Sequence, residues 1–170
     1  MYSKIQVNTA SALAVIPSDT VNIPEPASKV VEGTADFSVA GTLTDVGTTF
    51  TSDGINVGAI VYNTTANKAY YVASVDSDTA ISLSPSSAGG AADVYVIYNE
   101  STLGALLWVG SNEGTMDAAK SFVDVNVKTV NNSEVVFTNA KVGEYLPVQV
   151  TMLKDTSTSS AAKNNCLALS

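Results

Sequence analysis

The chain has 170 residues, a formal net charge of −8 and no histidine, and all eight of its basic residues are lysines. Without histidine and arginine, the usual general base near neutral pH, the commonest metal ligand and bidentate phosphate recognition are all missing. We therefore expect no catalytic residues, no cofactor and no metal. Because the net negative charge repels phosphates and anionic lipids, we also expect no nucleic-acid and no membrane partner.

The composition favours an all-β protein. Hydrophobic residues make up 45% of the chain and charged residues only 14%, while Thr, Ser, Asn, Val and Ala dominate, as is typical of strands and their turns. Cys166 is the only cysteine, so no intrachain disulfide can form, and we interpret it as a small apolar residue of the last strand. The first residues lack the continuous apolar stretch of a signal peptide, so we expect synthesis in the cytosol.

Residues 1–29 are predicted to form an extended arm. Pro17, Pro24 and Pro26 lie in the segment "VIPSDTVNIPEPAS", and each proline fixes φ and removes a backbone donor. The segment can therefore be neither a helix nor a central strand. It can lie along another surface, either in its own domain or in a neighbouring molecule.

Residues 30–100 are predicted to form a small β domain, either a barrel or a sandwich. Short β-type runs alternate there with segments rich in Gly, Ser, Asn and Asp. The predicted strands are 36–40, 58–63, 68–75, 79–84 and 93–98.

The stretch "TSDGINVGAIVYN" at residues 51–63 has two interpretations. A phosphate-binding loop needs its glycines to open a helix, but Gly58 leads into a strand pattern. We therefore favour a tight turn at Asp53–Gly54 and a bend or bulge at Gly58, where glycine supplies a positive φ.

Two further features of this domain have functional alternatives. Asp76, Asp78 and Asp93 suggest a Ca²⁺ site, although two carboxylates in "DSD" are more typical of a solvated turn. Tyr62, Tyr70 and Tyr71 suggest an exposed binding face for a glycan or a protein. Core packing is the interpretation that we favour for most of these tyrosines, and the adjacent Tyr70 and Tyr71 should point to opposite sides of their strand.

Residues 101–170 are predicted to form a second β domain, a sandwich or barrel that the arm completes, with a boundary near residues 99–103. Val123, Val125 and Val127 should face its core, opposite the polar residues between them. Trp108 is expected in the core or a buried interface. Residues 110–120 are expected to form one helical turn or a long loop. The predicted strands are 105–109, 121–127, 134–138, 145–151 and 165–169.

The arm and this second domain together resemble a small β domain of virion proteins from tailed phages and gene transfer agents. The matching motifs lie at Pro17 to Thr20, Trp108 to Gly110, Phe137 to Asn139 and Gly143 to Val150. The family's Gly-Thr-Thr segment before the last strand is replaced here by "DTSTSSAAKNNC". The resemblance covers about half of the chain.

The domain at residues 30–100 resembles a module found in phage structural proteins, and it is inserted between the arm and the rest of the other domain. The residues that carry the pattern are Asp45, Phe50, Gly54, Gly58, Val72, Val75 and Thr79.

The resemblance implies a non-enzymatic virion protein on the capsid surface that decorates or cements the head shell. Its expected partners are the major capsid protein and other copies of itself, with a trimer favoured over a pentamer. The alternatives are a tail or head-spike base protein and a carbohydrate-binding module of the virion. The expected anchor to the shell is the arm, at Val15, Ile16, Pro17, Val21, Ile23 and Pro24.

Overall fold

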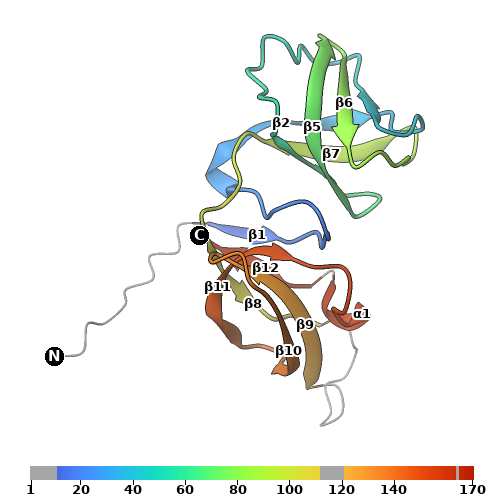
Figure 1. Cartoon of the computed structure of the whole chain (residues 1–170). Helices are drawn as coiled ribbons and strands as arrows, with labels where there is room; N and C mark the ends of the chain where they lie inside the picture. The colour runs from blue at the N-terminus through green and yellow to red at the C-terminus, as the bar shows by residue number, and fades with distance from the viewer. Residues whose placement is uncertain (1–10, 112–120, 164) are drawn as a thin grey trace, which may run out of the picture.

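A computed structural model describes residues 11–111, 121–163 and 165–170 of the chain. In these residues, twelve strands form two six-stranded antiparallel sheets, one above the other in Figure 1. The expectation of an all-β fold is confirmed.

The first sheet, which we call the C-terminal sheet, combines one arm strand with the second half of the chain. Its strand order is β1-β12-β8-β11-β9-β10. Val123, Val125 and Val127 on β9 are buried, as their alternation predicts. The strands are β1 (Ala12–Ala14), β8 (Ala105–Trp108), β9 (Phe122–Thr129), β10 (Glu134–Lys141), β11 (Tyr145–Leu153) and β12 (Leu167–Leu169).

The second sheet, which we call the middle sheet, has the order β2-β7-β4-β5-β6-β3. Its core contains the fully buried rings of Phe37, Phe50, Tyr70 and Tyr95. The ring centroids of Phe37 and Tyr70 lie 6.1 Å apart in a stacked arrangement. The strands are β2 (Lys29–Ala35), β3 (Thr42–Thr44), β4 (Ile60–Asn63), β5 (Lys68–Ser77), β6 (Ala80–Ser84) and β7 (Asp93–Tyr98).

The prediction of a strand at residues 36–40 is wrong. Strands lie before and after this segment, β2 and β3, and Phe37 between them inserts its ring into the core. The backbone of Phe37 pairs with the loop before β7, since its N–H donates to the carbonyl of Gly90 at 2.8 Å. An apolar side chain therefore occupies the core here without a place in a strand ladder.

Two short helices were not predicted, the 3₁₀ turn η1 (Pro26–Ser28) and the helix α1 (Ser160–Lys163). η1 has a proline at its start, where the missing N–H costs nothing. Most of the helical turn or loop expected at 110–120 lies outside the described residues.

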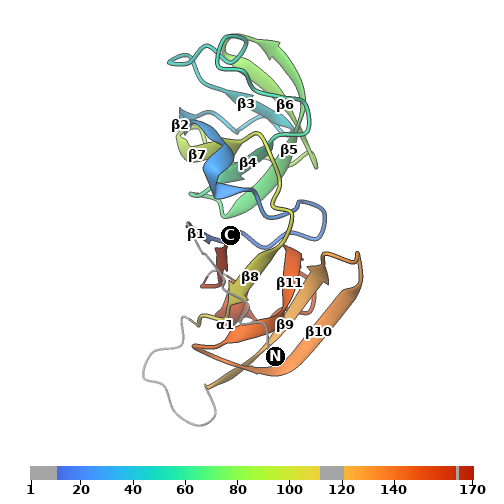
Figure 2. The ribbon, with the colours of Figure 1, turned by 90° about the vertical axis from the view of Figure 1, so that its left-hand side faces the viewer.

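The arm lies between the two sheets, as Figures 1 and 2 show from two sides. The N–H groups of Ser18 and Ile23 donate to the carbonyls of Leu153 and Thr151 on β11, at 2.9 and 2.8 Å. From the other side, the hydroxyl of Tyr71 on β5 accepts the N–H of Asn22 at 2.9 Å. The arm is therefore bonded to both sheets.

Candidate interaction surfaces and polar sites

The side chains predicted to anchor the arm to a capsid are buried within the chain. Val15 and Ile23 belong to the core of the C-terminal sheet. Ile16 and Val21 belong to a separate cluster, formed with residues of the middle sheet such as Ile60 and Tyr62. Pro17 and Pro24 are buried as well. In this conformation, the arm's apolar side chains join the two sheets to each other.

The candidate binding face at Tyr62, Tyr70 and Tyr71 is not exposed. Tyr62 is 2% and Tyr70 is 1% exposed, so both are core residues, and only Tyr71 is half-buried. The opposite orientation of Tyr70 and Tyr71 is as predicted, since Tyr70 packs in the core of the middle sheet and Tyr71 against the arm cluster. Burial raises the pKa of Tyr62, and the backbone amide of Ile16 offsets this only in part. No described group accepts the hydroxyl proton of Tyr62.

Gly54 and Gly58 act as turn residues. Their φ angles are +72° and +89°, and a Cβ added to either would meet nothing within 4 Å. Asp53 accepts a hydrogen bond from the hydroxyl of Thr48 at 2.8 Å and another from that of Thr49 at 3.2 Å. The turn interpretation of this segment is confirmed.

The three aspartates considered for Ca²⁺ have separate partners. Asp76 accepts the hydroxyl protons of Ser74 and Ser82, and these bonds lower its pKa. Asp93 accepts from the amide of Asn63 at 2.7 Å. The hydroxyl of Thr51 donates to Asp78. Over the described parts of the chain, no three acidic or cysteine side chains gather as a metal site would require.

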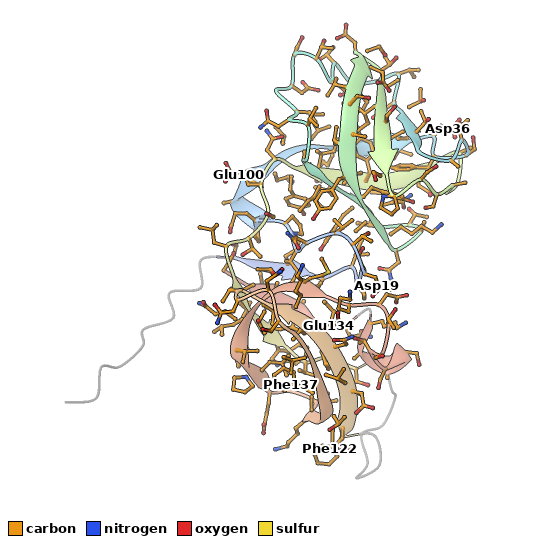
Figure 3. All side chains as sticks on the ribbon, viewed as in Figure 1. Asp19, Asp36, Glu100, Phe122, Glu134 and Phe137 are labelled. Carbon is orange, nitrogen blue, oxygen red and sulfur yellow. The ribbon has the colours of Figure 1, made fainter. Side chains whose placement is uncertain are left out.

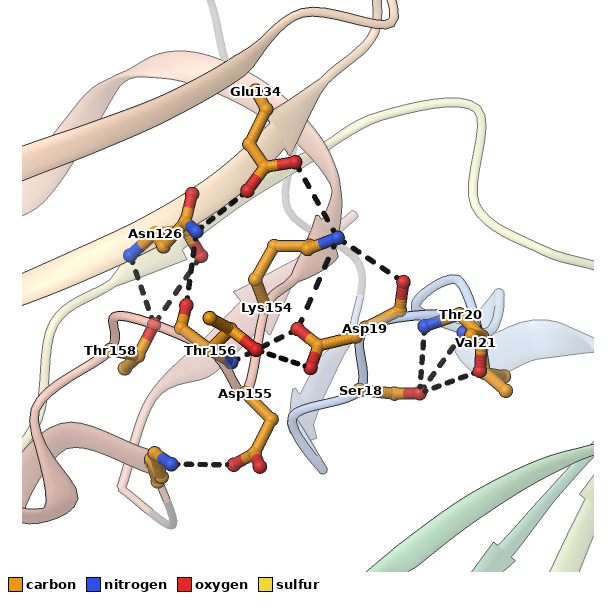
Figure 4. Close-up of polar contacts among 11 residues, drawn as sticks. Ser18, Asp19, Thr20, Val21, Asn126, Glu134, Lys154, Asp155, Thr156 and Thr158 are labelled. Carbon is orange, nitrogen blue, oxygen red and sulfur yellow. Dashed lines mark hydrogen bonds and ion pairs between the residues drawn. The ribbon is translucent and has the colours of Figure 1, made fainter. Parts of the chain in front are cut away.

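A polar network holds the arm against the C-terminal sheet (Figure 4). The carboxylate of Asp19 accepts the N–H of Thr156 at 3.0 Å and its hydroxyl at 2.6 Å. The ammonium group of Lys154 lies 3.5 Å from Glu134 and 4.0 Å from Asp19. Burial works against ionisation of Asp19, but the Thr156 hydrogen bonds and Lys154 outweigh it and leave its pKa lowered.

Asn126 is the buried centre of this network. Its side-chain amide donates to Glu134 at 2.9 Å and to the carbonyl of Thr156 at 3.0 Å. Its backbone N–H donates to the hydroxyl of Thr158 at 2.9 Å. The sequence pattern placed Asn126 on the polar side of β9 but gave no sign that the Ser- and Thr-rich loop after β11 would cover it.

A groove of about 390 Å³ runs between the arm and the middle sheet. It is lined by residues Pro17–Thr20 of the arm, Ala66–Tyr70 of the β4–β5 hairpin, Pro85, Ser87 and Asp155. The Tyr70 hydroxyl lies 3.0 Å from that of Ser87, and the ammonium group of Lys68 donates to the carbonyl of Ala88 at 2.8 Å. Most of these polar groups already have partners, so the groove offers shape more than reactivity.

Exposed apolar side chains occur on both sheets. Val39, Val46 and Val57 lie on loops of the middle sheet, whereas Phe122 and Tyr145 belong to the C-terminal sheet and are 47% and 54% exposed. Figure 3 labels Phe122 at the end of the C-terminal sheet that is far from the middle sheet, where Asp36 lies. Cys166 is fully buried beside β12, as expected for a small apolar residue, and burial raises the pKa of its thiol.

Gly110, in the motif Trp108 to Gly110, permits a close approach of two segments. A Cβ at this position would overlap the carbonyl oxygen of Asn165, just before the last strand. Trp108 itself is half-buried. The motif therefore has a packing role in this chain.

Comparisons of the chain with protein-family models, with curated proteins and with solved structures found no match. None of the described helices is long and apolar enough to cross a membrane.

Proposed function

We propose that this chain is a non-enzymatic structural protein of a tailed-phage virion. It decorates or cements the assembled head shell, in contact with the major capsid protein and with other copies of itself, as a trimer. It is made in the host cytoplasm and, in the virion, is located on the capsid surface. The motif resemblance motivates this role, and one structural observation supports it.

That observation is the way in which the arm joins two β units into one body. Rigid attachment suits a protein that must transmit load between neighbours on a shell, since packed interiors resist deformation. The charged groups of the network around Lys154 pair with one another, so they hold the arm to the C-terminal sheet. Exposed apolar residues on both sheets leave surface for docking.

The location of the protein in purified virions tests the proposal. Gold-labelled antibody against the chain, viewed by electron microscopy, should mark many sites spread over the head. Label at one vertex or on the tail would favour the spike-base alternative instead. A chain that is missing from intact particles would contradict both.

The arm as the anchor on the shell stays a prediction. Deleting residues 1–28 removes Val15 and Ile23 from one core and Ile16 and Val21 from another. Such a deletion would lose shell binding through misfolding alone. Cross-linking mass spectrometry of intact virions is a better test, since it reports whether arm residues such as Thr20 lie beside the capsid protein.

The carbohydrate-binding alternative is favoured by the groove beside Tyr70. Because the Tyr70 ring is buried, only its hydroxyl is available to bind a sugar there. Tyr70→Phe removes this hydroxyl and keeps the ring in the core. Binding on a glycan array that is lost in Tyr70→Phe would support the alternative, and an array without binding would exclude it.

A further inference from the structure

The side chains of Lys154, Asn126 and Glu134 meet at one carboxylate. The ammonium nitrogen of Lys154 lies 3.5 Å from Oε2 of Glu134. The side-chain nitrogen of Asn126 donates to Oε1 of the same carboxylate at 2.9 Å. Figure 4 shows Glu134 joined to both side chains. One carboxylate therefore contacts an amine and an amide, the two groups from which an amide cross-link can form.

The backbone fixes Lys154 directly opposite Asn126. The N–H of Lys154 donates to the carbonyl of Asn126 at 2.9 Å, which continues the register in which Leu153 pairs with Val127. Opposite residues carry their side chains on the same side of a sheet, with Cβ atoms about 4.5–5.5 Å apart. A lysine side chain spans this separation. Nζ of Lys154 can therefore reach Cγ of Asn126 by rotation about its own side-chain bonds.

Both side chains are shielded from solvent. Asn126 is 2% exposed, and the side chain of Lys154 is 16% exposed. The other ion-paired lysines among the described residues are more exposed than Lys154. Exclusion of water limits hydrolysis of the amide as a competing reaction. Fixed proximity of the two groups replaces the collision that a reaction between free molecules needs.

We propose that Lys154 and Asn126 form an intramolecular isopeptide bond. Glu134 takes a proton from the ammonium group through Oε2, and the resulting amine attacks Cγ of Asn126. The bond between Cγ and Nδ2 then breaks, and Glu134 passes the protons that Nζ gives up to Nδ2 through Oε1. Lys154 keeps one proton as an amide N–H, and the nitrogen of Asn126 leaves as ammonium. Glu134 ends as a carboxylate again, so atoms and charge balance without a further reactant.

The reaction is slow, because the carbonyl group of Asn126 is not activated. Its Oδ1 is buried and has no partner among the described residues, so no donor stabilises the negative charge that develops there. Lys154 also has a competing acceptor, the backbone carbonyl of Asp19 at 3.2 Å. The bond therefore forms only after folding. The hydrogen bonds of Asn126 described above belong to the chain before this reaction.

The bond gives the chain a covalent cross-link that its single cysteine cannot provide within one chain. It connects β9 to the residue after β11 and closes a loop that contains β10 and β11. A closed loop restricts the unfolded chain, as a disulfide does. The linked chain should therefore resist urea at higher concentrations than the unlinked chain.

Asn63 provides a comparison within the same molecule. It is also buried, donates to the carboxylate of Asp93 and lies opposite Lys68 in the sheet. The ammonium group of Lys68, however, donates to the carbonyl of Ala88. No carboxylate is shown to bridge the amine and the amide there. We expect Asn63 to stay unlinked.

Intact-mass spectrometry of the purified wild-type chain tests the proposal. The mass should fall by that of one ammonia molecule during storage for weeks at neutral pH. After digestion, fragmentation should identify a branched peptide that joins Lys154 to Asn126. A wild-type chain that keeps its full mass, or a branch at another lysine, would overturn the proposal.

Three variants assign the roles of the residues. Lys154→Arg keeps the positive charge, but a guanidinium group stays protonated and cannot attack, so the full mass should remain. Glu134→Gln cannot carry protons and should slow the loss of ammonia by about 100-fold. Lys128→Arg, opposite Glu134 in the sheet, is the matched control and should react like the wild type.

Loss of ammonia that persists in Lys154→Arg would contradict the proposal, because Asn126 would then have cyclised onto its own backbone. Circular dichroism checks that each variant folds. If Lys154→Arg misfolds, the branched peptide of the wild-type chain decides by itself. None of these outcomes depends on where the protein lies in a virion, so the test is separate from that of the proposed function.

Discussion

Asn126 shows how one residue connects three segments of this chain. Its side-chain amide donates to β10 and to the loop after β11, and the carboxylate of Asp19 in the arm binds Thr156 of the same loop. Asn126 is only 2% exposed, and its Oδ1 has no partner among the described residues. The residue therefore stabilises the fold through its two N–H bonds.

Asn126→Asp should be more destabilising than Asn126→Ala. Aspartate replaces the donating amide with a carboxylate that faces two acceptors, Glu134 and the carbonyl of Thr156. We expect Asn126→Asp to lower the free energy of unfolding by about 2–4 kcal/mol and Asn126→Ala by about 1–3 kcal/mol. Urea unfolding measures both values. Asn131→Asp, at an exposed turn, should change little, and equal losses for Asn126→Ala and Asn126→Asp would contradict this account.

Asp19 should make the stability of the arm depend on pH. The pKa of its carboxyl is lowered in the folded chain, so ionisation stabilises the fold above the unfolded-state pKa of about 3.9. This contribution is lost as the pH falls through the folded-state pKa. Asp19→Asn should therefore be less stable than the wild type near neutral pH, and the difference should shrink as the pH falls below the unfolded-state pKa.

Thermal unfolding near neutral pH and in acid, below the unfolded-state pKa, measures this difference for Asp19. Glu32→Gln, in an exposed pair with Lys29, is the control and should have little effect at either pH. A deficit in Asp19→Asn that stays constant down to low pH would show that the carboxylate charge is not its cause.

At the scale of elements, the arm is the part that determines how the sheets are joined. Val15 packs in the core of the C-terminal sheet, and its neighbour Ile16 packs in the cluster shared with the middle sheet, to which Val21 also belongs. Because the chain is extended there, neighbouring side chains point to opposite sides. A short segment can thus contribute to two cores.

Val15→Ala and Val21→Ala form a matched pair that separates these two roles. Both remove the same two methyl groups from a side chain that is 3% or less exposed. We expect Val15→Ala to lower the stability of the C-terminal sheet by about 1–3 kcal/mol. Val21→Ala should instead loosen the arm from the middle sheet and leave both sheets folded.

Amide hydrogen exchange distinguishes the outcomes. In Val15→Ala, exchange should become faster throughout β8, β11 and β12. In Val21→Ala, it should become faster mainly at Asn22, whose N–H is bonded to Tyr71. The same exchange pattern in both variants would mean that the chain behaves as a single cooperative core.

The strands with the clearest patterns were predictable, and those that depend on distant partners were not. The run "DVYVIY" forms β7 over the predicted residues 93–98, because it is bounded by turn residues and rich in β-branched and aromatic side chains. β1 has only three residues and exists because β12 pairs with it. β2 was missed because Glu32 and Gly33 interrupt its apolar pattern.

The candidate sites were harder to predict than the strands. Alternation shows that Tyr70 and Tyr71 face opposite sides of β5, but it cannot show which side is covered. Here both sides are covered, one by the core of the middle sheet and the other by the arm.

At the scale of the whole molecule, the net charge opposes the association between copies that the proposed function includes. Sixteen acidic residues against eight lysines make copies repel. The strength of this repulsion depends on salt, because the Debye length falls from about 30 Å at 0.01 M to about 10 Å at 0.1 M ionic strength.

Association between copies should therefore become stronger as salt is added, because screening weakens their repulsion. Sedimentation equilibrium in low and in moderate sodium chloride should show a dissociation constant several-fold lower at the higher salt. An interface held by ion pairs, for example between Lys68 of one copy and carboxylates of another, would respond in the opposite direction, so a dissociation constant that rises with salt would show that ion pairs hold the copies together.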